Sequence, residues 1–156
     1  MASRFMVYFV LALVVSGGLF YQEKKTHLPE SESVSTDLIS LGREVYVSEG
    51  CIHCHSQYVR PVGKDQALWG PPTSVETALS QEPVLIGNRR QGPDLANVGM
   101  RRDDSWNRLN LMQPSALVLG SRMPSYRHLF EGDGHRGEAL LAYLNSLQPS
   151  SLETNK

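Results

Sequence analysis

The sequence predicts a small, mostly α-helical domain that follows one N-terminal membrane-spanning helix, and three observations support this prediction. An uncharged apolar run fills residues 5–21. Apolar residues recur at helical spacing just before residue 50 and again near the C-terminus. No segment shows a clear alternation of apolar and polar residues, the pattern that is typical of a half-buried strand. The fold class that follows is all-α.

The composition narrows the class of protein. A chain of 156 residues supports one domain of ordinary size. A formal net charge of −1 argues against a protein that binds nucleic acid through a basic surface. Two cysteines are too few for a disulfide-rich secreted scaffold, and a mean hydropathy of −0.29 excludes a polytopic membrane protein. What remains is one domain whose cysteine pair needs a specific explanation.

The apolar run at residues 5–21 would measure roughly 26 Å as a helix, close to the hydrocarbon thickness of a bilayer. Tyr8 and Tyr21 stand near its ends, where aromatic rings favour the membrane interface. The alternative is a cleaved signal peptide, but no good cleavage site of small residues follows the run. We therefore expect a transmembrane anchor over residues 1–22 and a polar tether over residues 23–36.

The main domain is expected over residues 37–149, with a C-terminal tail over residues 150–156. Its first helix should begin at a cap formed by Thr36 or Asp37 and end at Gly50. The apolar residues that face its core are Leu38, Leu41, Val45 and Tyr46.

Two more helices are expected further along the domain. Residues 138–147 carry a broad apolar stripe, and Pro149 stops that helix. Residues 105–112 suit a short helix that starts near Asp103 or Asp104. The long segment over residues 57–92 is rich in proline and glycine and has no periodicity, which is typical of a functional loop. We expect the loop over residues 61–91, within this segment, to be a contact surface for a partner.

The strongest local signal is Cys51-Ile52-His53-Cys54-His55, which has the C-x-x-C-H spacing of a c-type haem attachment site. On one helical turn the two thiols can reach the two vinyl groups on one porphyrin edge, and the following imidazole can ligate the iron. Both cysteines of the chain are used in this way. The motif therefore predicts one covalently bound haem c.

Two other uses of the cysteine pair fit the sequence less well. A thioredoxin-type redox pair normally follows a strand in a βαβ unit, and no strand is expected before Cys51. A structural zinc site needs about four ligands, and His53 and His55 beside the two thiols would be crowded.

Three more residues are candidates for binding the haem. Met123 precedes a proline in a loop far from Cys54 and is the favoured sixth ligand, because a thioether raises the reduction potential; Met100 and Met112 are alternatives. The carbonyl of Pro93 can accept the Nδ1–H of His55 and so fix its tautomer. Arg60 is the favoured partner of a haem propionate.

The two terminal helices resemble those of class I cytochromes c. In that family a glycine and an aromatic residue of the first helix meet apolar residues of the last helix where the two cross. The matching residues here are Gly42, Tyr46, Leu140, Tyr143 and Leu144.

A more specific resemblance extends over residues 41–129. The strings that carry it, in order, are residues 50–57 with Arg60-Pro61, residues 92–99, residues 104–106 and residues 123–126. Together they resemble the membrane-anchored monohaem cytochrome c subunit of the C-family (cbb-type) haem-copper oxidases. The C-H-S-Q-x-x-R-P continuation is far more specific than C-x-x-C-H alone.

This resemblance implies that Cys51 and Cys54 form the thioether bonds, that His55 is the proximal ligand and that Met123 is the distal ligand. It also implies an uncleaved single-pass anchor in a bacterial inner membrane, with the haem domain on the periplasmic side. The implied partners are the catalytic subunit of a haem-copper oxidase and other cytochrome c subunits or donors.

We accordingly expect an electron-transfer subunit of a respiratory chain, with no catalytic centre of its own. Two alternatives stay open at this point. One is the monohaem cytochrome c subunit of a nitric-oxide reductase, which is also small and anchored. The other is a membrane-tethered haem sensor, whose sixth coordination site would be open or labile.

Overall fold

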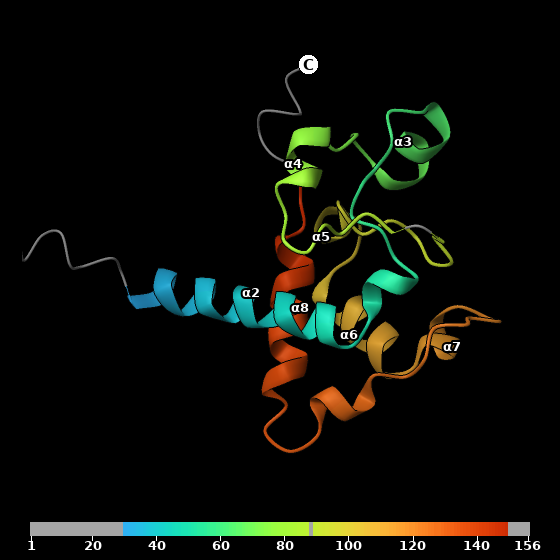
Figure 1. Cartoon of the computed structure of the whole chain (residues 1–156). Coiled ribbons are helices and arrows are strands. Elements are labelled where there is room, and N and C mark those ends of the chain that lie inside the picture. Colours follow the sequence, from blue (N-terminus) through green and yellow to red (C-terminus); the bar gives the residue numbers. More distant parts are fainter. Residues whose placement is uncertain (1–29, 88, 150–156) are drawn as a thin grey trace, which may run out of the picture. The chain divides into compact units, whose positions relative to one another are not determined.

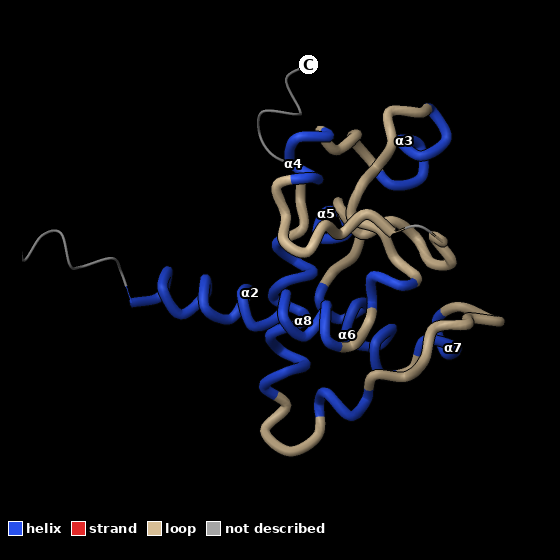
Figure 2. The backbone as a smooth tube through the Cα atoms, viewed as in Figure 1, coloured by secondary structure: helices blue, strands red, loops and turns tan. Residues whose placement is uncertain are grey.

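The computed structural model describes residues 30–87 and 89–149, and within these residues it is helical with no strands (Figure 2). This confirms the all-α prediction for that part of the chain. The chain divides into two compact units, residues 1–36 and residues 37–156, and the architecture below is that of the second unit. The predicted anchor lies outside the described residues, among which no helix is long and apolar enough to cross a membrane.

The described helices are short apart from two, one near each end of the domain (Figure 1). The α-helices are α2 (Glu30–Ser48), α3 (Gly63–Trp69), α4 (Val75–Leu79), α5 (Val98–Arg101), α6 (Asp104–Met112), α7 (Pro114–Leu117) and α8 (His135–Ser146). Two 3₁₀ turns complete the set, η1 (Cys51–His53) and η2 (Arg127–Phe130).

The core of the domain is built where α2 crosses α8 (Figure 1). The crossing is close because Gly42 has no side chain: a Cβ at that position would lie 1.9 Å from the carbonyl oxygen of Ala139. One turn further along α2, the ring of Tyr46 packs edge-on against the ring of Tyr143, with 5.6 Å between the ring centroids. Tyr46 and Leu140 are both at most 1 % exposed. The packing matches the crossing that the sequence resemblance implies.

The helix boundaries differ from the prediction mainly at the N-terminal ends. The prediction that the first helix begins at Thr36 or Asp37 is wrong, because α2 already begins at Glu30. Neither proline nor glycine stands between residues 30 and 41, and extending a nucleated helix through polar residues costs little. The last part of the predicted tether is therefore helical. At its other end α2 stops at Ser48, and Gly50 has a φ of +72°, as expected for the residue that ends it.

Helix α6 is positioned by its own cap and by α8. The Asp103 carboxylate accepts a hydrogen bond from the backbone N–H of Trp106 at 2.7 Å, so Asp103 is the N-cap. The helix covers the predicted range, starting one residue earlier at Asp104. Its buried Leu111 joins the core cluster that includes Tyr143 and Leu144. This places the C-terminal half of α6 beside the crossing.

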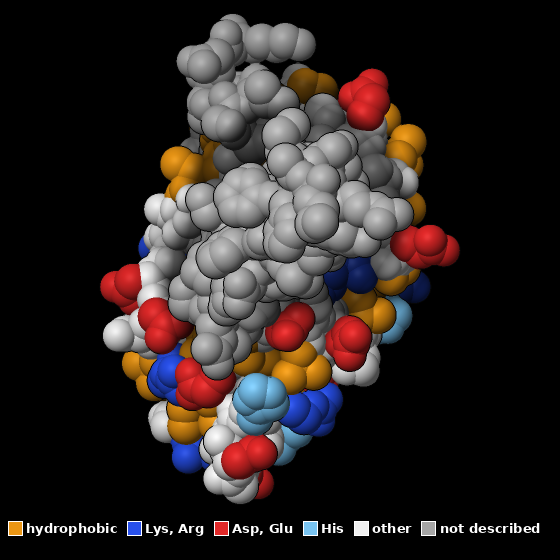
Figure 3. Space-filling view, turned by 90° about the vertical axis from the view of Figure 1, so that its left-hand side faces the viewer, with side chains coloured by type: hydrophobic (Ala, Val, Ile, Leu, Met, Phe, Trp, Pro, Cys, Tyr) orange, Lys and Arg blue, Asp and Glu red, His pale blue; other side chains and the backbone are white. Residues whose placement is uncertain are grey.

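The segment that the sequence leaves without periodicity contains two short helices, α3 and α4. Several of its large apolar side chains are exposed, among them Leu68, Val75 and Leu79. On the face drawn in Figure 3, acidic and basic side chains of the described residues lie interspersed, in keeping with the near-zero net charge.

Candidate functional site

The cysteine motif forms one tight turn directly after α2. Gly50 adopts the left-handed backbone conformation that ends α2, and η1 follows at once. The backbone N–H of His55 donates to the carbonyl of Cys51 at 2.9 Å, which closes the turn. Cys51 is buried, Cys54 is half-buried, and both are free thiols. The two thiols and the imidazole are thus presented by a single turn.

Burial raises the pKa of the Cys51 thiol to about 11. A cysteine that acts as a nucleophile or as a disulfide-exchange group needs a lowered pKa. The environment of Cys51 therefore argues against the thioredoxin-type alternative. Within the described ranges, no three His, Cys, Asp or Glu side chains lie together as a possible metal cluster, so the zinc alternative lacks its ligand set there.

The imidazole of His55 is fixed by the segment that follows residue 91. Its Nδ1 lies 2.8 Å from the carbonyl oxygen of Pro93. A carbonyl can only accept, so Nδ1 carries a proton; when the ring is neutral, Nε2 then keeps its lone pair. Burial lowers the pKa of His55 from its usual value, against the opposing effect of the hydrogen bond to Pro93. The ring is therefore held neutral, which is the state that a metal ligand requires.

Gly92 provides the seat for the same ring. A Cβ on Gly92 would lie 2.3 Å from Cε1 of His55, so no other residue fits here without moving the imidazole. The backbone N–H of Gly92 donates to the carbonyl of Cys54, and that of Leu95 donates to the carbonyl of Ser56, both at 2.8 Å. Residues 92–95 therefore run beside residues 54–56, and Gly92 packs against the His55 ring.

Met123 lies in the loop between α7 and η2 and packs against the core cluster. The side-chain amide of Asn110 on α6 approaches its sulfur at 3.5 Å. The loop is tied to the end of α6 by two more hydrogen bonds: Ser125 Oγ donates to the carbonyl of Met112 at 2.8 Å, and the N–H of Tyr126 donates to the carbonyl of Leu111 at 2.8 Å. Of the three candidate methionines, Met100 is the exposed one, at 60 %.

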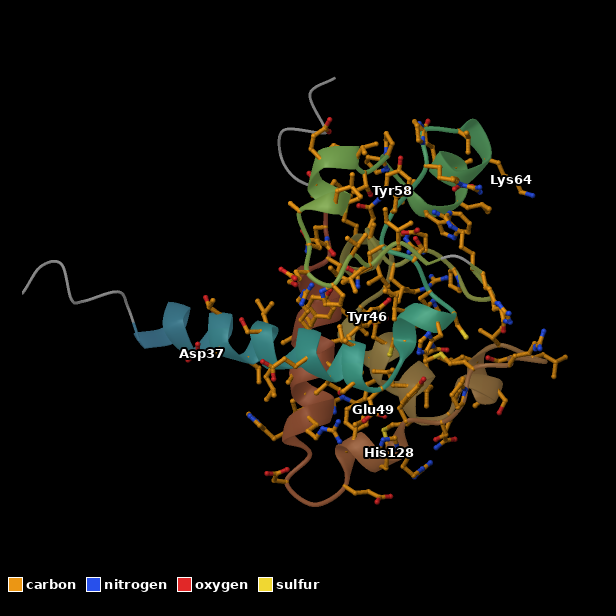
Figure 4. The ribbon with its side chains drawn as sticks, viewed as in Figure 1. Asp37, Tyr46, Glu49, Tyr58, Lys64 and His128 are labelled. Atoms are coloured by element: carbon orange, nitrogen blue, oxygen red, sulfur yellow. The ribbon has the colours of Figure 1, made fainter. Side chains whose placement is uncertain are left out.

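A surface ion-pair cluster joins the end of α2 to η2 and α8. Glu49 stands two residues before Cys51, and Figure 4 shows it close to His128. Its carboxylate lies 3.2 Å from Nε2 of His128 and accepts from the Arg136 guanidinium at 2.7 Å. The turn after Met123 is thereby attached to the helix that leads into the cysteine motif.

Arg60, predicted to reach a propionate, is engaged elsewhere in this structure. Its guanidinium donates through Nε and Nη2 to the carboxylate of Asp65, at 2.6 and 2.9 Å. The Arg60 side chain is 52 % exposed, whereas Asp65 is 2 % exposed. The Arg60 guanidinium holds the pKa of Asp65 below its usual value. A role for Arg60 toward a propionate stays a prediction.

Gln57 also lines a pocket of about 170 Å³ to which no residue of the cysteine turn contributes. Its lining consists of Gln57, Thr73, Thr77, Gln81, Ala96, Asn97, Ser146, Leu147, Gln148 and Pro149. Gln57 is buried, and its Oε1 accepts from the hydroxyl of Tyr143 at 2.9 Å. Gln57 thus links the cysteine motif to the helix crossing.

Several residues of the site escaped the sequence analysis. They are Asn110 beside the Met123 sulfur, Gly92 as the seat of the imidazole, and the ionic group of Asp65, Arg90 and Asp94. Gly92 could have been found from its place just before Pro93, because a glycine is needed where the backbone approaches a ring closely. Asp65 carries no such signal, since its arginine partners are fixed only by the folded loop.

The residues present fit a haem c. The two thiols of one turn are free, and the following imidazole is neutral with Nε2 unprotonated. The glycine cradle holds that ring against one carbonyl acceptor. Met123, from a different part of the chain, supplies a thioether in a loop that is hydrogen-bonded to α6.

The comparisons with known proteins agree with this donor set. A family model described as "FixO: Cytochrome C oxidase, mono-heme subunit/FixO" matches residues 1–148. The match therefore covers the cysteine motif, the Gly92–Pro93 segment, Met123 and α8. No curated protein matches the chain.

Proposed function

We propose an electron-relay function from one premise: the chain belongs to the FixO family, the mono-haem subunits of cytochrome c oxidase. In this proposal the protein receives electrons from a donor, such as another cytochrome c, and passes them to the catalytic subunit of a cbb-type haem-copper oxidase. It has no catalytic centre of its own. The observation that carries the proposal is the His55 imidazole, held through Nδ1 by the Pro93 carbonyl and presented by the same turn as two free thiols.

A bound haem c would supply a reversible one-electron redox centre. Cys51 and Cys54 would hold it through thioether bonds, and His55 and Met123 would ligate its iron. The protein's own contribution is to orient these side chains. Pro93 and Gly92 fix the His55 ring, and the Asn110 amide approaches the Met123 sulfur. Cys51 is buried, so its thiol is shielded from water. A thioether ligand raises the reduction potential, which suits a carrier that delivers electrons to an oxidase.

The membrane arrangement is part of the proposal. The apolar run at residues 5–21 would anchor the chain by a single pass in a bacterial inner membrane, with the haem domain on the periplasmic side. Anchoring raises the effective concentration of the domain at its partner and makes the encounter effectively intramolecular.

The coordination is tested by replacing Met123 in the full chain. We expect Met123→Ala to abolish the absorption band of the methionine–iron bond and to lower the reduction potential. Met100→Ala is the matched control, because Met100 is exposed, and it should leave both properties unchanged. If Met123→Ala leaves the resting coordination of the iron unaltered, the relay proposal is overturned in favour of a haem sensor.

The partner is tested by purification from membranes in mild detergent. We expect a copper-containing oxidase subunit to accompany the chain. An iron-containing nitric-oxide reductase subunit in its place would overturn the choice of acceptor, and recovery of a free monomer would overturn the relay to an oxidase altogether. Haem that stays on the denatured chain demonstrates covalent attachment, and loss of the haem on denaturation would contradict it.

A further inference from the structure

Arg90 adopts a backbone conformation that its residue type rarely accepts. Its φ is +44°, the one positive value at a non-glycine residue in the described part of the chain. In this left-handed region the Cβ of an ordinary residue crowds the backbone, so the conformation persists only where the surroundings hold it. The contacts of the Arg90 side chain explain how this conformation is maintained.

The side chain of Arg90 is the centre of a network between two stretches of chain. Its Nη1 donates to the carboxylate of Asp65 at 2.9 Å, and its Nη2 donates to the carbonyl of Tyr58 at 2.5 Å. The same Nη2 lies 3.4 Å from Ser56 Oγ and 3.7 Å from the Asp94 carboxylate. Lysine cannot replace this planar fork, because an ammonium is a single point of charge and donation.

Three acceptors around Arg90 belong to the buried residues Ser56, Asp65 and Asp94, and Asp65 also accepts two hydrogen bonds from Arg60. Ser56 is fully buried, and Asp65 and Asp94 are each 2 % exposed. Asp94 is held from other sides as well, since it accepts from the N–H groups of Tyr58 at 3.1 Å and Ala96 at 2.9 Å. Buried acceptors that lose their partner carry a full desolvation penalty. The network therefore has little freedom to rearrange.

Two members of the network stand on either side of Gly92 and Pro93, the residues that hold the His55 imidazole. Arg90 precedes Gly92 and Pro93, and Asp94 follows them. Arg90 and Asp94 are both fixed to the stretch of residues 56–58, which directly follows His55. These attachments, together with the backbone hydrogen bonds from Gly92 and Leu95, keep the carbonyl of Pro93 beside Nδ1 of His55.

We propose that Arg90 is a positioning residue for the proximal ligand. Its side chain locks residues 90–94 against residues 56–58, and this keeps the Pro93 carbonyl on Nδ1 of His55 and Gly92 under the ring. Arg90 would act through these two residues, because its own hydrogen bonds go to Asp65, Ser56 and Tyr58 and not to a proposed ligand of the iron. The inference rests on the proposed function, because it concerns the residue that would ligate the haem iron.

The experiment measures hydrogen–deuterium exchange of the His55 Nδ1–H by NMR in the reduced, haem-loaded full chain. The amide of Leu140, at the centre of the helix crossing, is the internal reference for global unfolding. In Arg90→Lys and Arg90→Asn we expect the ratio of the His55 rate to the Leu140 rate to rise about tenfold or more, as local opening becomes easier. Arg89→Asn, at the exposed neighbouring position, should leave the ratio as in the wild type.

The two substitutions at Arg90 separate the possible causes. Asparagine tolerates the left-handed backbone, so a role in backbone conformation alone would leave Arg90→Asn normal. Lysine keeps the positive charge, so a role in charge alone would leave Arg90→Lys normal. Either normal variant overturns the proposal, and so does a parallel rise of both rates, which would show only a general loss of stability.

A milder substitution tests the proposal in case the Arg90 variants do not fold. Asp65→Asn leaves Arg90 in place and weakens one of its attachments, so we expect a smaller rise in the same ratio; an unchanged ratio overturns the proposal. The failure of the proposed function is seen separately. If the wild-type chain carries no haem, the relay proposal fails, whereas haem-loaded Arg90 variants with a wild-type ratio overturn the positioning role alone.

Discussion

The helix crossing and the segment over residues 57–94 are held together by different kinds of interaction. At the crossing, α2 and α8 meet through close packing of Gly42 on Ala139 and of two tyrosine rings. The described residues of 57–94 form only two short helices, and buried ionic and hydrogen-bonding groups around Asp65 and Arg90 fix the course of this segment. The crossing should therefore respond to changes in volume, and the segment to changes in charge and pH.

The largest effect of a change in volume at the helix crossing is expected at Gly42. We expect Gly42→Ala to lower the free energy of unfolding by about 3 kcal/mol or more, because the new Cβ meets the main chain of α8 and the helices must separate. Urea unfolding of the full chain, followed by circular dichroism, measures the loss. Gly63→Ala is the control, since a Cβ there meets nothing within 4 Å, and it should stay within about 1 kcal/mol of the wild type. Equal effects at both glycines would contradict the packing argument.

The second prediction concerns Asp65 and the response to acid. The arginines hold its pKa below the usual Asp value, so its stabilising contribution is complete above about pH 4 and is lost as the pH falls through the lowered value. Asp65→Asn should therefore be less stable than the wild type at pH 7, and the difference should shrink toward pH 3.

Urea unfolding at the two pH values measures this change. Glu76→Gln, at an exposed position of α4 in the same segment, is the control and should leave the pH dependence of the wild type intact. A difference between Asp65→Asn and the wild type that stays constant with pH would show that the carboxylate does not act through its charge.

The smallest effects are expected from the two tyrosine hydroxyls at the crossing. Tyr143 donates to the buried Oε1 of Gln57 at 2.9 Å, so Tyr143→Phe should lower the free energy of unfolding by about 1–2 kcal/mol. The Tyr46 hydroxyl is buried and lies near the Gln57 side chain, but within the described part of the chain it makes no hydrogen bond of good geometry. Tyr46→Phe should therefore leave that free energy unchanged or raise it. Urea unfolding of both variants measures these changes in the free energy of unfolding. A larger loss from Tyr46→Phe than from Tyr143→Phe would show that the Tyr46 hydroxyl makes the more important hydrogen bond.

The two regions also differ in how far the sequence predicts them. Helical spacing of apolar residues reveals α8 and the second part of α2, because each helix buries one continuous face. The same rule misses the start of α2 at Glu30, where the helix continues through polar residues. In residues 57–94 no periodic face exists, so α3 and α4 are not visible as a pattern.

The candidate site shows the same division. Cys51, Cys54 and His55 are recognisable because their chemistry requires a fixed spacing along the chain. The carbonyl of Pro93 was predicted as an acceptor from its place in a rigid turn, and it lies beside His55 Nδ1. The partners of Arg60 and Arg90 depend on contacts across the loop, which no local rule supplies.

The contact between Gly42 and Ala139 has a consequence for the order of events during synthesis. A ribosome makes the chain from its N-terminus, so residues 51–55 exist long before residue 139 does. Until α8 is made, the groove of α2 around Gly42 has no occupant, and the core that buries Cys51 is incomplete. Under the proposed function, thioether formation at both thiols would therefore be easiest before the last helix packs against α2.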